Sequence, residues 1–175
     1  VMNIASLAVR KINYSSYSMG NWVRSITSDE QHVYAGTKDG IYQFNMNLQE
    51  EAHYTTDSKL PHNDINHIFK DSQNRILFAA RANGIYQLTS EGEIHNFYPS
   101  QLGEIEFRSI AEDENGGIWA ATYGDGVFYF SDDSVYNLMV PSGLKANYCY
   151  SIVRGADNSM WVGHRLGMSR INTEN

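Results

Sequence analysis

Short apolar runs alternate with polar turns along almost the whole chain. Each run holds about five residues and is rich in Ile, Val, Tyr, Phe and Trp, which is typical of β-strands, whereas polar breaks such as residues 113–117 fit hairpin turns. No stretch with the period of a helix is long enough to compete with this pattern. The sequence therefore predicts an all-β protein of short antiparallel strands.

The strand pattern recurs at a constant interval. One isoleucine reappears every 42 residues, at Ile26, Ile68, Ile110 and Ile152. Each copy is expected to form a four-stranded antiparallel sheet, although the last copy ends after its third strand. The four repeats span approximately residues 21–62, 63–104, 105–146 and 147–175.

Turn chemistry supports the repeat. An Asp stands three residues after the repeat isoleucine in three copies, where its carboxylate can accept backbone N–H bonds within a turn: Asp29, Asp71 and Asp113, with Gly155 in the fourth copy. A glycine precedes the third strand of each copy, where we expect a positive φ or a close backbone approach: Gly40, Gly84, Gly126 and Gly167.

A single antiparallel sheet cannot cover both of its own faces, so each unit must pack against the next. The residues expected between neighbouring sheets share one position of the second strand: Tyr34, Leu77, Trp119 and Trp161. An interval near 42 residues and radial repetition of such sheets are typical of a β-propeller. We therefore predict one β-propeller-type domain over residues 1–175, with residues 4–17 as an outer strand.

Two arrangements fit four units. In one, the strand within residues 4–17 completes the fourth blade and closes a ring of four. In the other, which we favour, the chain is a partial propeller or arc, and that strand belongs to a preceding blade. An arc exposes apolar faces at its two ends, which self-association or neighbouring blades of a full-length chain would cover.

Composition and charge remove several classes of function. The net charge is −7 and no cluster of Lys and Arg occurs, which argues against a nucleic-acid partner. No apolar run is long enough to cross a bilayer, so we expect no membrane contact by this segment. The single cysteine, Cys149, is expected to be a buried apolar residue.

Three stretches carry a family resemblance. The sequence IAEDENGGIWAATYGDGVFYF at residues 110–130 resembles the two-component regulator propeller repeat, and VYAGTKDGIYQF and MWVGHRLGM keep the centre of that motif. The resemblance covers residues 21–175. It departs from the motif at residues 77–80, which replace a Trp-x-Gly-Thr element, and at His164, which stands where Thr37 and Thr122 do.

The resemblance implies a role. Repeats of this family form the extracytoplasmic sensor region of bacterial hybrid histidine kinases, often tied to recognition of glycan breakdown products. It implies a periplasmic or extracellular segment of a membrane-anchored receptor that senses an oligosaccharide, without catalysis or a cofactor in this segment. The alternatives are a structural or protein-interaction propeller fragment and a polysaccharide lyase or hydrolase.

Loops at one face of a propeller would form the ligand site. The segment entering the first strand and the loop between the second and third strands should open on the same face, here called the mouth. Basic and aromatic residues in these loops can donate hydrogen bonds to carboxylate, sulfate or hydroxyl oxygens and offer flat apolar surfaces. The predicted ligand-binding residues are Trp22, Lys38, Arg81, Arg108, Tyr123, Tyr148, His164 and Arg165.

The sequence gives little support to catalysis or metal binding. The turn aspartates are expected near the far face, one to a blade, too far apart for a general acid/base pair. The six histidines show no ligand spacing, so we expect no metal site.

Overall fold

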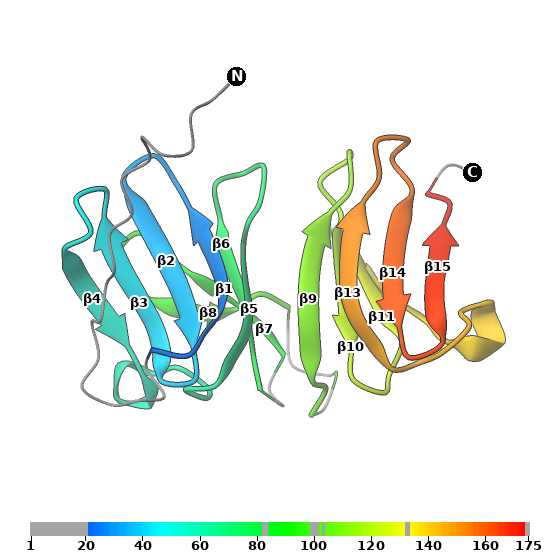
Figure 1. The fold of residues 1–175 in the computed structure, drawn as a ribbon, viewed down its shortest axis with the longest axis horizontal. Helices are drawn as coiled ribbons and strands as arrows, with labels where there is room; N and C mark the ends of the chain where they lie inside the picture. The colour runs from blue at the N-terminus through cyan, green and yellow to red at the C-terminus, as the bar shows by residue number, and fades with distance from the viewer. Residues whose placement is uncertain (1–20, 82–83, 99–101, 103, 132–133, 174–175) are drawn as a thin grey trace, which may run out of the picture.

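The computed structural model describes residues 21–81, 84–98, 102, 104–131 and 134–173. The outer strand expected within residues 4–17 lies outside this part of the chain. The described strands form four consecutive antiparallel sheets, here called blades one to four, and each is a meander in chain order (Figure 1).

The strand bounds follow the repeat. Blade one contains β1 (Val23–Ser28), β2 (His32–Thr37), β3 (Gly40–Asn45) and β4 (Glu50–Tyr54). Blade two contains β5 (Ile65–Lys70), β6 (Ile76–Ala80), β7 (Ile85–Leu88) and β8 (Ile94–Asn96). Blade three contains β9 (Phe107–Glu112), β10 (Ile118–Thr122), β11 (Val127–Ser131) and β12 (Ser134–Leu138). Blade four has the three strands β13 (Cys149–Arg154), β14 (Met160–His164) and β15 (Gly167–Ile171). Two 3₁₀ turns, η2 (Thr56–Ser58) and η3 (Val140–Ser142), follow β4 and β12.

The blades pack through their first strands. β1 lies against β5, β5 against β9 and β9 against β13, whereas no contact of that extent joins β1 to β13 among the described residues. The four blades therefore form an arc and not a closed ring of four. The prediction of an all-β partial propeller is confirmed.

A bulge shapes the packing face of each first strand. In β5 the register with β6 shifts between Ile65 and His67. Because successive side chains of a strand alternate between its faces, residues three apart normally point to opposite sides, and the bulge restores a common side. Ile65 and Ile68 consequently lie in the same buried cluster, where an added Cβ on Gly36 of blade one would approach the side chains of both.

The position expected between neighbouring sheets is buried in three of the four blades. Tyr34, Leu77 and Trp119 are at most 6% exposed, but Trp161 is 38% exposed. The prediction for Trp161 is wrong because no blade follows blade four in this arc.

A polar contact accompanies each apolar interface. The residue before the repeat isoleucine accepts a hydrogen bond from the backbone N–H of the isoleucine of the next blade. Ser25 Oγ accepts from Ile68 N at 3.1 Å, and Ser109 Oγ accepts from Ile152 N at 3.3 Å. His67 Nδ1 accepts from Ile110 N at 3.2 Å. Neighbouring blades are separate sheets with no strand pairing between them, so these side chains supply the acceptors that the buried backbone N–H groups need.

The turn aspartates act as predicted. In blade three, Asp113 Oδ1 accepts hydrogen bonds from the backbone N–H of Asn115 and Gly117, each at 2.9 Å. Its second oxygen accepts the indole N–H of Trp119 at 2.8 Å. Asp29 and Asp71 cap the equivalent turns. One carboxylate thus fixes both a hairpin and a core side chain.

The glycine before the third strand gives a testable pair. Gly126 has φ +77°, and an added Cβ would lie 2.1 Å from the carbonyl oxygen of Leu138. Gly167 holds the same turn position with φ +114° but has nothing within 4 Å. We expect Gly126→Ala to lower the free energy of unfolding by about 3 kcal/mol and Gly167→Ala by about 1 kcal/mol in urea titrations. Equal losses would show that only φ, and not the backbone approach, requires glycine here.

Burial of His67 predicts a pH dependence. Loss of hydration lowers the pKa of His67 from 6.5 to about 4, so the folded state binds its proton less readily than the unfolded chain. The associated stability is complete above about pH 6.5 and is lost as the pH falls toward 4, amounting to about 3 kcal/mol. We expect His67→Ser, which keeps an acceptor as Ser25 and Ser109 do, to lose less stability between pH 7 and pH 4 than the wild type. Parallel urea titrations at both pH values check this, and identical losses would contradict it.

Candidate functional site

Hydrogen bonds hold the two sets of predicted loops together. The backbone N–H of Tyr123 donates to the carbonyl of Glu106 at 2.9 Å, and Arg165 N–H donates to Tyr148 O at 3.0 Å. Arg81 N–H donates to Asp64 O at 2.9 Å in the same way. In blades two, three and four, the loop between second and third strands is therefore tied to the segment entering the first strand of its own blade, and these loops lie on one face of the arc, the mouth.

An exposed aromatic cluster lies where blades three and four meet at the mouth. The ring of Tyr123 lies 5.1 Å from that of Tyr148 and 6.2 Å from that of Tyr150, centroid to centroid. The guanidinium of Arg108 sits 4.9 Å from the Tyr123 centroid. All three tyrosines are more than 40% exposed. Arg108, Tyr123, Tyr148 and Tyr150 are called the tyrosine cluster below.

Arg108 is held in place from one side. One terminal nitrogen pairs with Glu106 Oε1 at 2.7 Å. Its Nε is buried and has no hydrogen-bond partner among the described residues. The part of the charged guanidinium that is exposed lies beside open aromatic faces, and this combination favours an oxygen-rich ligand.

The predicted residues of blades one and two form separate pairs. Lys38 Nζ lies 3.6 Å from the ring centroid of Trp22, a cation–π contact at an exposed indole. Arg81 lies 3.8 Å from the carboxylate of Asp64, which also pairs with Arg24 at 3.2 Å. Asp64 is buried and lies closer to Arg24, so the exposed Arg81 is only loosely paired with it.

His164 has a structural role in its loop. Its Nδ1 accepts the backbone N–H of Leu166 at 3.2 Å, and its Nε2 lies 2.9 Å from Ser169 Oγ. Thr122 does the equivalent work in blade three, where its hydroxyl accepts Asp125 N–H at 3.0 Å and donates to Gly126 O at 2.8 Å. His164 therefore replaces a threonine as the buried cap of a hairpin, and its ring does not face the mouth with a free nitrogen.

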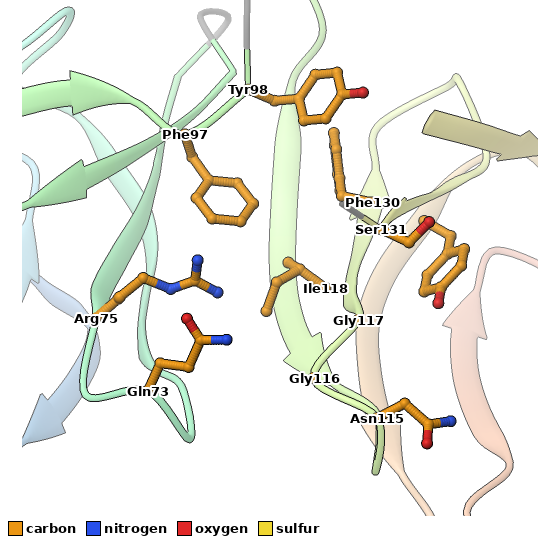
Figure 2. Close-up of a pocket in the computed structure, with 11 residues that line it drawn as sticks. Gln73, Arg75, Phe97, Tyr98, Asn115, Gly116, Gly117, Ile118, Phe130 and Ser131 are labelled. Carbon is orange, nitrogen blue, oxygen red and sulfur yellow. The ribbon is translucent and has the colours of Figure 1, made fainter. Parts of the chain in front are cut away.

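The structure contains a pocket that sequence reasoning missed. It has a volume of about 400 Å³ and lies between blades two and three, at the hairpin turns opposite the mouth (Figure 2). Arg75, Phe97, Tyr98, Asn115 and Phe130 are among its lining residues. Pockets that bind small molecules are commonly of this size.

One guanidinium and several aromatic rings define this pocket. Arg75 Nε donates to the fully buried carboxylate of Asp71 at 2.5 Å, and its guanidinium carbon lies 5.1 Å from the Phe97 centroid. Phe130 packs against Phe97 and Tyr98, with centroids 6.3 and 5.4 Å away. Figure 2 shows the guanidinium and the Phe97 ring facing the same space. This combination can hold a small carboxylated ring compound.

The position of Arg75 differs from blade to blade. Arg75 precedes β6, and the equivalent turn position holds His32 in blade one, Gly117 in blade three and Ser159 in blade four. A Cβ on Gly117 would lie 2.4 Å from the Tyr129 ring, so small size is required on that side. An arginine where blades three and four have a small residue was the one signal in the sequence.

Neither a membrane-spanning helix nor a cluster of metal ligands occurs among the described residues. No helix in this part of the chain is long and apolar enough to cross a membrane. No three His, Cys, Asp or Glu side chains of the described ranges are grouped so that they could hold a metal ion.

Comparisons with known proteins agree with the repeat. Residues 101–124 match the family described as two component regulator propeller. No curated protein matched the chain. The extracellular domain of a hybrid two-component system from B. thetaiotaomicron superposes with a TM-score of 0.76 and 24% identity, covering 91% of this chain and 22% of that one.

Two further solved structures share the fold. The extracellular domain of a second hybrid two-component system from B. thetaiotaomicron has a TM-score of 0.56 and 16% identity, with 93% of this chain and 28% of that chain covered. Virginiamycin B lyase from Staphylococcus aureus has a TM-score of 0.68 and 20% identity, with 89% and 54% covered. The chain thus spans between 22% and 54% of the length of these proteins.

These findings define the class. The chain is a β-propeller segment with the fold of extracellular regions of hybrid two-component systems and of a lyase. Within it, residues 101–124, which include β9 and β10 of blade three, match the two component regulator propeller family.

Proposed function

We propose that this chain is a ligand-sensing, non-enzymatic segment of the extracytoplasmic propeller of a bacterial two-component receptor, located in the periplasm or outside the cell. The family match at residues 101–124 and the likeness to extracellular domains of hybrid two-component systems support this role. The observation that carries ligand binding is the exposed tyrosine cluster, which the mouth loops of blades three and four present around one guanidinium.

The ligand that suits this cluster is an acidic oligosaccharide fragment. Phenol rings present flat faces that pack against the C–H side of a pyranose, while the Arg108 guanidinium donates charge-assisted hydrogen bonds to a carboxylate or sulfate. The exposed Trp22 with Lys38, and Arg165, extend the basic and aromatic character along the mouth. A ligand touching loops of both blades would favour one relative arrangement of them, which is how binding could shift a receptor between states.

Two alternatives make different predictions. A structural or protein-interaction fragment would bind no sugar, and the exposed faces at the ends of the arc are the observation in its favour. A lyase or hydrolase would convert its ligand, and the likeness to virginiamycin B lyase is the reason to test for products.

Binding at the tyrosine cluster can be tested by calorimetry with uronic-acid tetrasaccharides. We expect Tyr123→Ala and Arg108→Gln each to weaken binding about tenfold, since each removes about 1.4 kcal/mol of stacking or charge-assisted hydrogen bonding. Tyr136→Ala is the matched control, because Tyr136 is an exposed tyrosine on the outer strand β12.

The outcomes separate the alternatives. Equal affinity for neutral tetrasaccharides of the same length, or unchanged binding in Tyr123→Ala, would contradict a role for this cluster. Absence of binding across charged and neutral oligosaccharides would favour the interaction fragment, and accumulation of unsaturated or shortened products would favour the lyase or hydrolase.

The pocket between blades two and three is a second candidate position for an acidic sugar, and its volume suits a monosaccharide. We expect galacturonate to bind there and Arg75→Lys to weaken that binding about tenfold, because lysine keeps a charge beside Asp71 but loses the planar fork that grips a carboxylate. Arg154→Lys, at an exposed arginine of blade four, is the control. Calorimetry with galacturonate and with galactose measures the effect, and equal affinity for the two sugars would overturn this position.

A further inference from the structure

Glu106 holds both parts of the tyrosine cluster. Its backbone carbonyl accepts the N–H of Tyr123 at 2.9 Å, and its side-chain oxygen Oε1 pairs with Arg108 at 2.7 Å. The side chain of Glu106 is 23% exposed and that of Arg108 is 32% exposed, so this ion pair is open to solvent. One residue thus fixes a ring and a guanidinium that the proposed ligand would contact.

The repeat shows that the fold does not require an acid at this position. The equivalent residue lies directly before the first strand of each blade, and it is Asp64 in blade two, Glu106 in blade three and Tyr148 in blade four. Because blade four forms the same strands with a tyrosine there, the carboxylate of Glu106 is not a determinant of the blade.

Asp64 shows how an acid at this position serves packing. It is buried, and it pairs with Arg24 of blade one at 3.2 Å. Arg24 also donates to Asn66 of blade two at 2.5 Å, so this ion pair joins two blades. Glu106 and Arg108 lie two residues apart within blade three, so their ion pair does not hold neighbouring sheets together.

The ion pair of Glu106 and Arg108 leaves one hydrogen-bonding group free on each partner. Glu106 Oε1 takes one terminal nitrogen of Arg108, whereas Glu106 Oε2 and the other terminal nitrogen have no hydrogen bond to the described residues. The free oxygen can accept a hydrogen bond and the free nitrogen can donate one. The Tyr123 ring lies beside them, 4.9 Å from the guanidinium carbon. A ring compound with a hydroxyl next to an acidic group matches all three features.

A simple anion lacks one of these matches. It can accept hydrogen bonds from Arg108, but it must compete with Glu106 for the guanidinium and its charge is repelled by the carboxylate. A fully ionised anion such as sulfate has no hydrogen atom to donate to Glu106. A hydroxylated acid loses less, because its hydroxyl donates a charge-assisted hydrogen bond to the same carboxylate.

We infer that Glu106 determines the selectivity of the tyrosine cluster, because it admits a hydroxylated acid such as a uronic acid and excludes simple anions. This inference rests on the proposed ligand site and adds the residue that sets its specificity. Tyr123 and Tyr148 supply the apolar surface, Arg108 attracts the acidic group, and Glu106 imposes the need for a hydroxyl.

Sulfate binding to the Glu106→Gln variant tests this role. NMR of the backbone amides of Tyr123 and Tyr148 reports binding at the cluster during titration with sodium sulfate, with sodium chloride keeping the ionic strength constant. Glutamine keeps the shape of glutamate without its charge, so we expect the affinity for sulfate to rise about tenfold. The affinity for a uronic-acid tetrasaccharide should stay within about threefold of the wild type, because weaker repulsion offsets a weaker hydrogen bond.

Three further variants serve as controls. Glu50→Gln removes the same charge at the exposed start of the outer strand β4, away from the mouth, and should leave sulfate binding at the cluster unchanged. Glu106→Asp keeps the charge and should still exclude sulfate. Glu106→Ser removes the charge with a smaller side chain and should admit sulfate as Glu106→Gln does. Circular dichroism checks the fold of each variant.

The outcomes for Glu106 and for the proposed function are distinct. Equal sulfate affinity in the wild type and in Glu106→Gln would overturn the inference, and so would an equal rise in Glu50→Gln or in Glu106→Asp. A wild type that binds no oligosaccharide would overturn the proposed ligand class whatever the sulfate titration shows. A wild type that binds the tetrasaccharide, with variants that bind sulfate no better, would overturn the role of Glu106 alone.

Discussion

The structure depends on burial of the flank of each sheet against the next. An antiparallel sheet with apolar residues on both faces is unstable in water, and here each interior blade satisfies both faces by lying between two others. The bulge near the start of each first strand makes this possible, because it turns two residues three positions apart, such as Ile65 and Ile68, toward the same neighbour. The residue before each repeat isoleucine then accepts a hydrogen bond from the backbone N–H of the isoleucine in the next blade, which links neighbouring first strands.

The same constraint places the candidate sites. Side chains buried between blades are mainly apolar, and polar ones such as Ser25 and His67 are used in hydrogen bonds to the next blade, so the candidate sites lie at the two rims where strands end. At the mouth, backbone bonds between loops hold Tyr123 and Tyr148 beside each other. At the opposite rim, the turn carboxylate of Asp71 holds Arg75 above Phe97. Both candidate sites lie between blades, so a ligand at either would contact two sheets whose relative position is not fixed by strand pairing.

Most of the fold could be predicted because its determinants are local and repeat. The sequence alone indicated the interval of 42 residues, the turn aspartates and the glycines with positive φ. The structure shows the sheets, caps and glycine conformations expected from them. The mouth loops were also correctly brought to one face. Within them, Tyr150 was not among the predicted residues, and His164 was assigned to a ligand although it caps its hairpin as Thr122 does.

What the sequence alone determined is the repeating unit, since strand, turn and face alternation depend on residues close together in the chain. The tertiary structure decided which of these units have neighbours and what the rims bring together. Trp119 and Trp161 occupy the same position of the repeat, yet only Trp119 is buried, because burial depends on the sheet beside it and not on local sequence. The pocket at Arg75 likewise combines two blades, and its shape depends on packing that the spacing of residues along the chain does not encode.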